Sequence, residues 1–168
     1  MSGFSHLDER GRARMVDVGG KPVTRRTALA EAWVVLGRDV LEKLLAGDLS
    51  KGDALAVARV AGIQGAKRTS EWIPLCHPLA LDHVRVDFEA ERETGRLRVL
   101  AETSCRASTG VEMEALCAVS AAALALYDLC KALERGIRIE GIRLLRKEGG
   151  RSGIWEAEGG EPEEGGGS

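Results

Sequence analysis

Residues 83–105 are HVRVDFEAERETGRLRVLAETSC. Apolar residues alternate with charged ones along 83–91, where Val84, Val86, Phe88 and Ala90 share one face. The alternation resumes along 96–105, and a period of two is that of a β-strand with one buried face. Glu93-Thr94-Gly95 lies between the two runs and is typical of a tight turn. The stretch therefore predicts a β-hairpin.

The segments around this hairpin predict two further strands and three helices. Residues 23–36 end in a β-branched and aromatic run and predict a strand, although a helix stays open there. Residues 38–46, 51–68 and 113–133 have helical spacing, and residues 137–146 predict a last strand. Two glycines weaken the helix over 51–68, and Thr109-Gly-Val-Glu112 fits a capping box at the start of the longest helix.

This order predicts an α+β fold of the ferredoxin-like, split βαβ type (βαββαβ), with an antiparallel sheet and helices on one face. The other face of the sheet would then be uncovered. The longest helix is also apolar nearly all round, because alanines occupy the sides that flank its leucine and valine stripe. Both features predict a homo-oligomer.

Length and composition limit the function classes. The 168 residues predict a single domain over 1–153, followed by a disordered Gly/Glu-rich tail over 154–168 that holds five of the 26 acidic residues. The remaining body carries 24 basic and 21 acidic residues, a net charge of +3, which suits an anionic small molecule. An aromatic content of 4% argues against nucleic acid. No apolar run is expected to approach membrane-spanning length and no leader is evident, so we expect a cytoplasmic protein with no membrane contact.

Two carboxylates on the longest helix suggest a shared site. Glu114 and Asp128 are fourteen residues apart, which places them about 40° apart on one stripe. At helical rise they are about 21 Å apart, too far to act on one small substrate within a chain. If both bind the ligand, two chains build the site. The alternative is that Glu114 favours the helix dipole and that Asp128 forms a surface ion pair with Lys131.

The basic residues are mostly arginine: the chain has 18 Arg and six Lys. Lysine can transfer a proton when its pKa is depressed, whereas arginine cannot, so Lys51, Lys67, Lys131 and Lys147 are candidates. The segment 147–153, KEGGRSG, could bind phosphates or be a flexible exit into the tail. The segment 62–69, GIQGAKRT, lacks the spacing of a P-loop, although Lys67 could still meet an anion.

The stretch 73–79, IPLCHPL, holds two of the four prolines around a Cys-His pair. A metal site would need further ligands nearby, and a Cys76 nucleophile would need a separate base. A structural turn stays open. We favour a loop stiffened by proline that presents His77 and backbone groups to a ligand. The four cysteines have no CxxC spacing and are expected to be reduced thiols, with no metal bound.

Four blocks together resemble the cyclic pyranopterin monophosphate synthase (MoaC) family of molybdenum cofactor biosynthesis: SHLDERGRARMVDV, KGDALAVARVAGIQGAKRTSEWIPLCHPL, STGVEMEALCAVSAAALALYDLCKAL and RLLRKEGGRSG. The resemblance spans residues 5–153. It implies a hexamer, a trimer of dimers, with active sites at subunit interfaces. It also implies a lyase that converts 3',8-cyclo-7,8-dihydro-GTP to cyclic pyranopterin monophosphate and releases pyrophosphate.

By the same resemblance, Asp128 and Lys51 would be general acid/base residues, with Lys131 beside them. The substrate contacts it implies are Leu75, Cys76, His77, Glu112, Met113 and Glu114, and the phosphates would fall to Lys67, Lys147 and Arg151. No cofactor is required, although Mg²⁺ could accompany the triphosphate. Two other classes stay open at this point: a module that binds a nucleotide without changing it, and an RNA-binding protein.

Overall fold

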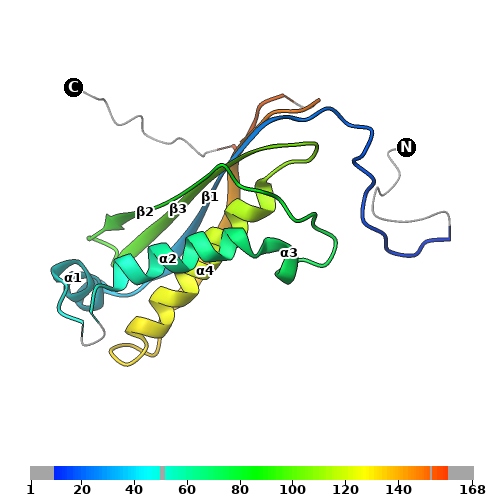
Figure 1. Cartoon of the computed structure of the whole chain (residues 1–168). Coiled ribbons are helices and arrows are strands. Elements are labelled where there is room, and N and C mark those ends of the chain that lie inside the picture. Colours follow the sequence, from blue (N-terminus) through cyan, green and yellow to red (C-terminus); the bar gives the residue numbers. More distant parts are fainter. Residues whose placement is uncertain (1–9, 50–51, 152, 159–168) are drawn as a thin grey trace, which may run out of the picture.

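The computed structural model describes residues 10–49, 52–151 and 153–158 (Figure 1). It contains five strands and four helices over these residues. In chain order they are β1 (Thr24–Val35), α1 (Arg38–Ala46), α2 (Ala54–Lys67), α3 (Thr69–Trp72), β2 (His83–Glu91), β3 (Arg96–Ala107), α4 (Glu112–Cys130), β4 (Arg138–Glu148) and β5 (Trp155–Glu156).

The strands form one antiparallel sheet in the order β2-β3-β1-β4-β5. The predicted hairpin is confirmed, with His83 opposite Ser104 at one end and Glu91 opposite Arg96 at the other. Strand β1 runs between β3 and β4, so the hairpin strand β3 is inserted between β1 and β2. This is the split βαβ arrangement, and the predicted α+β, ferredoxin-like fold is confirmed.

Gly95 closes the hairpin where only glycine fits. Its φ is +69°, and a Cβ there would lie 2.5 Å from the backbone nitrogen of Arg38. The Gly95 carbonyl oxygen accepts hydrogen bonds from the backbone N–H groups of Leu36 and Gly37 at 3.0 Å each. The turn thus joins the hairpin to the start of α1.

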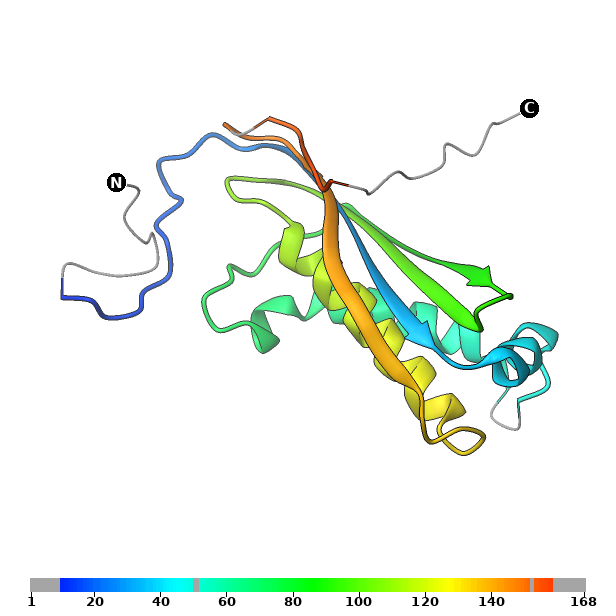
Figure 2. The ribbon, with the colours of Figure 1, turned by 180° about the vertical axis from the view of Figure 1, so that it is seen from behind.

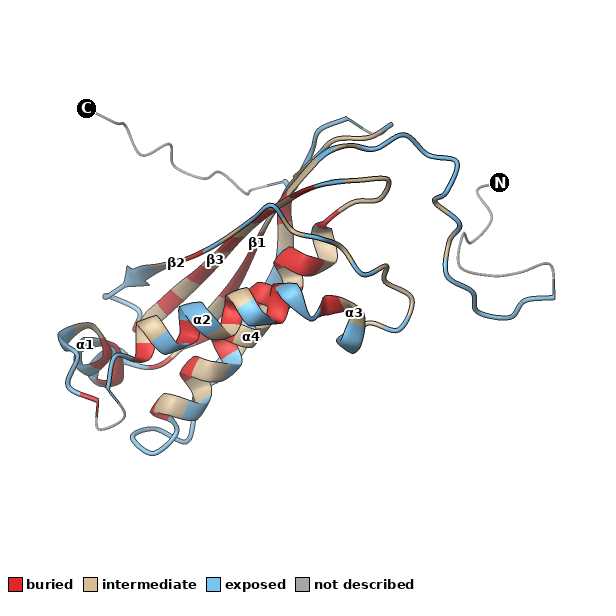
Figure 3. Ribbon diagram, viewed as in Figure 1, coloured by how far each residue is buried: buried red, intermediate tan, exposed pale blue. Residues whose placement is uncertain are grey.

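Helices α2 and α4 cover one face of the sheet (Figure 1), and the view from behind shows the sheet in front of them (Figure 2). Buried residues gather between the two layers (Figure 3), including Ala28, Ala30 and Val34 of β1. Gly65 lets the two helices approach closely, because a Cβ there would lie 2.6 Å from the Cβ of Ala121. The glycines that weakened the predicted helix over 51–68 therefore lie within it as packing positions.

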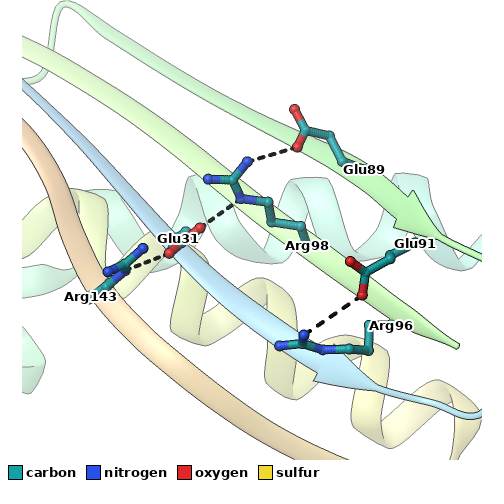
Figure 4. Close-up of polar contacts among 6 residues, drawn as sticks. All are labelled: Glu31, Glu89, Glu91, Arg96, Arg98 and Arg143. Carbon is teal, nitrogen blue, oxygen red and sulfur yellow. Dashed lines mark hydrogen bonds and ion pairs between the residues drawn. The ribbon is translucent and has the colours of Figure 1, made fainter. Parts of the chain in front are cut away.

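The uncovered face is crossed by a chain of charges (Figure 4). The buried carboxylate of Glu31 on β1 accepts hydrogen bonds from Nε of Arg98 on β3 and Nε of Arg143 on β4, both at 2.6 Å. Arg98 also pairs with Glu89 on β2 at 3.1 Å. Four adjacent strands are thus linked by ion pairs on the face that none of the described helices covers.

Helix α4 corrects one expectation drawn from composition. It has an 18-residue window of mean hydropathy 1.6, so an apolar run of membrane-spanning length does occur. The helix packs against α2 and the sheet, and 56% of that window is buried within the chain. A core helix has the same composition, so this length carries no argument for a membrane.

Element boundaries differ from the predictions at three places. The capping box was wrong: α4 begins at Glu112 after Val111, without a side-chain cap, because the Glu112 carboxylate binds Lys147 instead. The same helix ends at Cys130 rather than at residue 133. The structured chain also extends past residue 153, since Trp155 and Glu156 pair with β4 and Arg146 forms an ion pair with Glu156 at 3.3 Å. Residues 159–168 of the predicted tail lie outside the described residues.

Candidate active site

The proline-stiffened loop lies between α3 and β2. The short helix α3 ends at Trp72, and the Cys76 N–H then donates to the Ile73 carbonyl oxygen at 3.0 Å, which forms a turn. Leu75, Cys76 and His77 are half-buried. The loop is therefore held against the body of the protein with its three central residues partly accessible.

One cavity of about 310 Å³ joins this loop to the first turn of α4. The loop contributes Leu75, Cys76 and His77, and the helix contributes Glu112, Met113 and Glu114. These are the six substrate contacts implied by the resemblance, which come from segments some 35 residues apart in the chain. The structure brings all six of them together at one site.

Glu114 is a buried carboxyl group in this cavity, and its pKa is raised. Its side chain belongs to the first turn of α4, yet the residue is only 4% exposed. Desolvation raises the pKa of Glu114 from 4.5 to about 7, and the nearby charge of Glu112 adds to the rise, although its own backbone N–H lowers it. A carboxyl group with such a pKa can hold or release a proton near neutral pH.

Cys76 lacks the electrostatic environment of a nucleophile. Burial raises the pKa of its thiol, and the negative charge of Glu114 raises it further. A reactive cysteine needs the opposite shift, because the thiolate is the nucleophile. All four cysteines carry free thiols, as the prediction of reduced thiols requires.

Basic residues extend the site along the end of the sheet. Lys147 on β4 donates to a Glu112 carboxylate oxygen at 3.0 Å, so the two groups bind one another in this structure. Arg151 lines a neighbouring cavity of about 440 Å³. That cavity shares Lys21, Thr109 and Gly110 with the cavity at the loop, so the two lie next to each other.

Three of the predicted residues that the structure describes line neither the loop cavity nor the basic cavities next to it. Lys67 lines a separate hollow of about 410 Å³ beside His83. Asp128 and Lys131 lie near the other end of α4, where their side chains are 58% and 54% exposed and pair with each other at 2.5 Å. Lys51, the other candidate acid/base residue, lies outside the described residues.

The Asp128–Lys131 pair as it stands in one chain is not tuned for proton transfer. The hydrogen bond and the charge of Asp128 raise the pKa of Lys131, whereas donation of a proton near neutral pH would need it lowered. Both side chains are exposed to solvent, which screens their interaction. Within a single chain, this end of α4 therefore matches the surface ion pair that was the alternative interpretation.

Several lining residues were missed from the sequence. Val16, Val18, Lys21, Thr109 and Gly110 line the cavity at the loop, and Arg26 lines the adjoining basic cavity. Arg26 could have been found by the alternation of β1, because it shares a face with the inward-facing Ala28 and Ala30. The segment before the first strand has no hydrophobic periodicity. No periodic pattern therefore indicates its lining residues Val16, Val18 and Lys21. Over the described ranges, no group of three or more His, Cys, Asp or Glu side chains gathers as a metal site.

Fold and site together define a small α+β protein with a partly apolar cavity that holds Glu112, Glu114 and His77, beside a basic cavity suited to an anionic group. Comparison with known proteins makes this specific: the model of the MoaC family matches residues 15–150, and the chain belongs to that family. It is 55% identical over 155 residues to the cyclic pyranopterin monophosphate synthase of Chloroflexus aggregans, covering 92% of this chain and 94% of the relative. It is also 55% identical to the synthase of Methylobacterium nodulans, with 94% and 99% of the two chains covered, and 52% identical to that of Pelotomaculum thermopropionicum, with 95% and 94% covered.

Proposed function

We propose that this chain is a cyclic pyranopterin monophosphate synthase, which converts 3',8-cyclo-7,8-dihydro-GTP to cyclic pyranopterin monophosphate and pyrophosphate in molybdenum cofactor biosynthesis. The observation that carries the proposal is the single cavity lined by all six implied contact residues, from Leu75 to His77 and from Glu112 to Glu114. Relatives more than 50% identical over nearly their full length carry the same name.

The residues fit the chemistry of this reaction. Rearranging a purine-derived tricycle requires several proton transfers and no net redox step, which Lys and carboxyl groups can supply. Glu114 has a pKa near the working pH and lies in the cavity. Lys147 and Arg151 would stabilise the phosphates as pyrophosphate leaves. Mg²⁺ with the triphosphate stays an optional companion in this scheme.

The acid/base residues at the far end of α4 would act across a subunit interface. Asp128 and Lys131 are separated from the cavity by the length of the helix, so they would reach the cavity of a second chain packed antiparallel on α4. The outer surfaces of α2 and α4 support this, because Val57, Val60 and Leu124 are exposed there. Covering Asp128 and Lys131 with a partner would also remove the solvent that now screens them. A hexamer built from such dimers is the assembly we expect.

The decisive experiment is direct turnover. The purified protein is incubated with the cyclic GTP derivative, and released pyrophosphate and a fluorescent oxidised pterin are measured. Asp128→Asn and Lys51→Ala should each lower turnover by about 10²- to 10⁴-fold without loss of assembly. Glu140→Gln, which removes an exposed carboxylate of β4, is the matched control and should keep full activity. Undiminished product from either variant would remove that residue from the mechanism, and binding without turnover by the wild type would favour a nucleotide-binding module.

Mixing two inactive variants tests whether two chains share a site. Asp128→Asn and Glu114→Ala each disable one end of α4. If each site takes one end from each chain, random mixing leaves about a quarter of the sites intact, since half of the dimers are mixed and each has one wild-type site. Activity should return to about that fraction after the variants are mixed and reassembled. No recovery from fully exchanged subunits would place both ends in one chain's site and contradict the shared arrangement.

A further inference from the structure

Thr103 places a buried hydroxyl group in an otherwise apolar stripe of β3. The residues of this strand on the helix-covered face are Leu97, Val99, Ala101, Thr103 and Cys105, and all five are buried. Thr103 is 0% exposed. A hydroxyl group is costly to bury without a hydrogen-bond partner, so its presence at this position requires a partner within the core.

That partner is the carbonyl oxygen of Val111, to which the Thr103 hydroxyl donates at 3.1 Å. Val111 is buried and directly precedes α4. The bond therefore joins β3 to the start of α4 across the connection 108–111. Thr109 and Gly110 of this connection line the loop cavity. The hydroxyl thus holds in place a segment that forms one wall of the cavity.

The start of α4 has little other support from side chains. Among the described residues, none caps it with a side-chain hydrogen bond, because the Glu112 carboxylate binds Lys147 instead. The Val111 carbonyl oxygen accepts a long bond of 3.4 Å from the Ala115 N–H within the helix. Helix ends without such support fray. The Thr103 hydroxyl therefore supplies from the sheet an anchor that the helix's own side chains do not.

The turn that Thr103 anchors carries the buried carboxyl group of the site. Glu114 comes three residues after Val111, is 4% exposed and lines the loop cavity. Burial and the negative charge of Glu114 raise the pKa of the Cys105 thiol, so β3 lies close to this carboxyl group. Successive residues of a helix point about 100° apart, so an unravelled first turn would move the Glu114 side chain out of its place.

We propose that Thr103 is a positioning residue for the reaction, because its hydroxyl holds the Val111 carbonyl group and thereby fixes the Glu114 carboxyl group in the cavity. The effect on turnover rests on the proposed function, whereas the effect on the place of Glu114 does not. The competing explanation is that the bond only satisfies a buried hydroxyl and stabilises the fold. Loss of the hydroxyl would then affect the whole fold and not Glu114 in particular.

Four variants separate these two roles. Thr103→Val keeps the shape of the side chain and removes the hydroxyl. Thr103→Ser and Thr103→Ala both lose the methyl group, and only the serine keeps the hydroxyl, so their difference isolates the hydrogen bond. Val99→Ala is the stability control: Val99 is buried on the same face of β3, about 13 Å along the strand, and lines neither the loop cavity nor the basic cavities beside it. It should destabilise the core without releasing the start of α4.

The first measurement is a carbon NMR titration of the Glu114 carboxyl group, identified by its loss in Glu114→Gln. The pKa of Glu114 is about 7 in the wild type. Thr103→Val and Thr103→Ala should lower this pKa by about one pH unit or more, because a released turn exposes the carboxyl group to water. Thr103→Ser and Val99→Ala should leave it within about 0.3 pH units of the wild type. The ionisable groups whose charges interact with Glu114 are the same in all four variants: Cys76, Cys105, Glu112 and Cys117.

Two outcomes of the titration would overturn the proposal. One is an unchanged pKa of Glu114 in both variants that lack the hydroxyl. The other is an equal fall in Val99→Ala, because general loss of stability would then explain the effect.

Turnover of the cyclic GTP derivative is the second measurement, and it distinguishes this proposal from the proposed function. Thr103→Val and Thr103→Ala should lower kcat about tenfold, and Thr103→Ser should keep it within about threefold of the wild type. A wild-type protein that releases no pyrophosphate would contradict the proposed function, while a fall in the pKa of Glu114 confined to the variants without the hydroxyl would still support the positioning of Glu114. Full kcat in those variants, beside an active wild type, would overturn the role of Thr103 in the reaction.

Discussion

Two glutamates are buried among the described residues, and they differ in whether arginines pair with them. Glu31, on the uncovered face of the sheet, is 2% exposed and bonds two arginines at 2.6 Å each (Figure 4). Glu114, at the start of α4, is 4% exposed and forms no ion pair with any described Lys or Arg. Its pKa is raised to about 7, chiefly by desolvation.

The difference separates a carboxylate that is paired within the fold from one that we propose takes part in the chemistry of the site. Desolvation alone would lower the pKa of Arg98, but the hydrogen bonds and charges of Glu31 and Glu89 raise it, so its guanidinium stays charged. A buried charge without such partners is costly, and it persists where function requires it. The unpaired carboxylate is also the one that lies in the cavity.

Removing the paired carboxylate should have the largest effect on stability. Glu31→Ala leaves Arg143 without this carboxylate and Arg98 with Glu89 alone, and we expect a loss of about 3 kcal/mol in the free energy of unfolding. Glu89→Gln is the control, because that side chain is 57% exposed and should contribute less than about 0.5 kcal/mol. Denaturant unfolding measures both. Similar losses in the two variants would mean that the buried cluster does not support the sheet.

Neutralising the unpaired carboxylate of Glu114 should instead increase the free energy of unfolding. Glu114→Gln keeps the shape of the side chain and removes the cost of a buried negative charge, so it should raise the free energy of unfolding at pH 8 by about 1 to 3 kcal/mol. Turnover should fall in the same variant, because the amide cannot transfer a proton. A variant that is less stable than the wild type, or that keeps full activity, would contradict this assignment.

The stability of the wild type should also depend on pH through Glu114. Between pH 4.5 and 7 the folded state keeps the proton of this carboxyl group, while the unfolded state loses it. Stability from this group is therefore complete below pH 4.5 and falls by about 1 kcal/mol per pH unit up to pH 7. Unfolding of the wild type and Glu114→Gln across this range isolates the contribution as a difference. A difference that stays constant with pH would show that the pKa of Glu114 is not raised.

The smallest effect is expected at the Cys-His pair of the loop. Cys76→Ser should keep turnover within about threefold, because a thiol with a raised pKa is not a nucleophile. His77→Ala should lower turnover at least tenfold, since it removes a polar group from the cavity. Steady-state kinetics of the two variants settles the order, and a larger loss for Cys76→Ser would reverse the assignment.

Much of the fold could be predicted because its periods are clear. The alternation of residues 83–105 gave the hairpin, and β1, α1 and α2 were placed to within a few residues. Boundaries that depend on side-chain partners were missed: Glu112 was expected to cap α4, but it binds Lys147, which is 35 residues away. The short strand β5 was missed because Trp155 and Glu156 form a strand only through backbone pairing with β4.

The amino-acid sequence alone was sufficient to predict the fold class and the family, and to single out the residues of the 73–79 loop and of the first turn of α4. These predictions depend on local periods and contiguous motifs. The place of Arg26 in the basic cavity, the pairing of Lys147 with Glu112 and the contrast between Glu31 and Glu114 came only from the packed chain. Each depends on contacts between strands and helices that are distant in sequence, and burial and charge pairing are properties of those contacts.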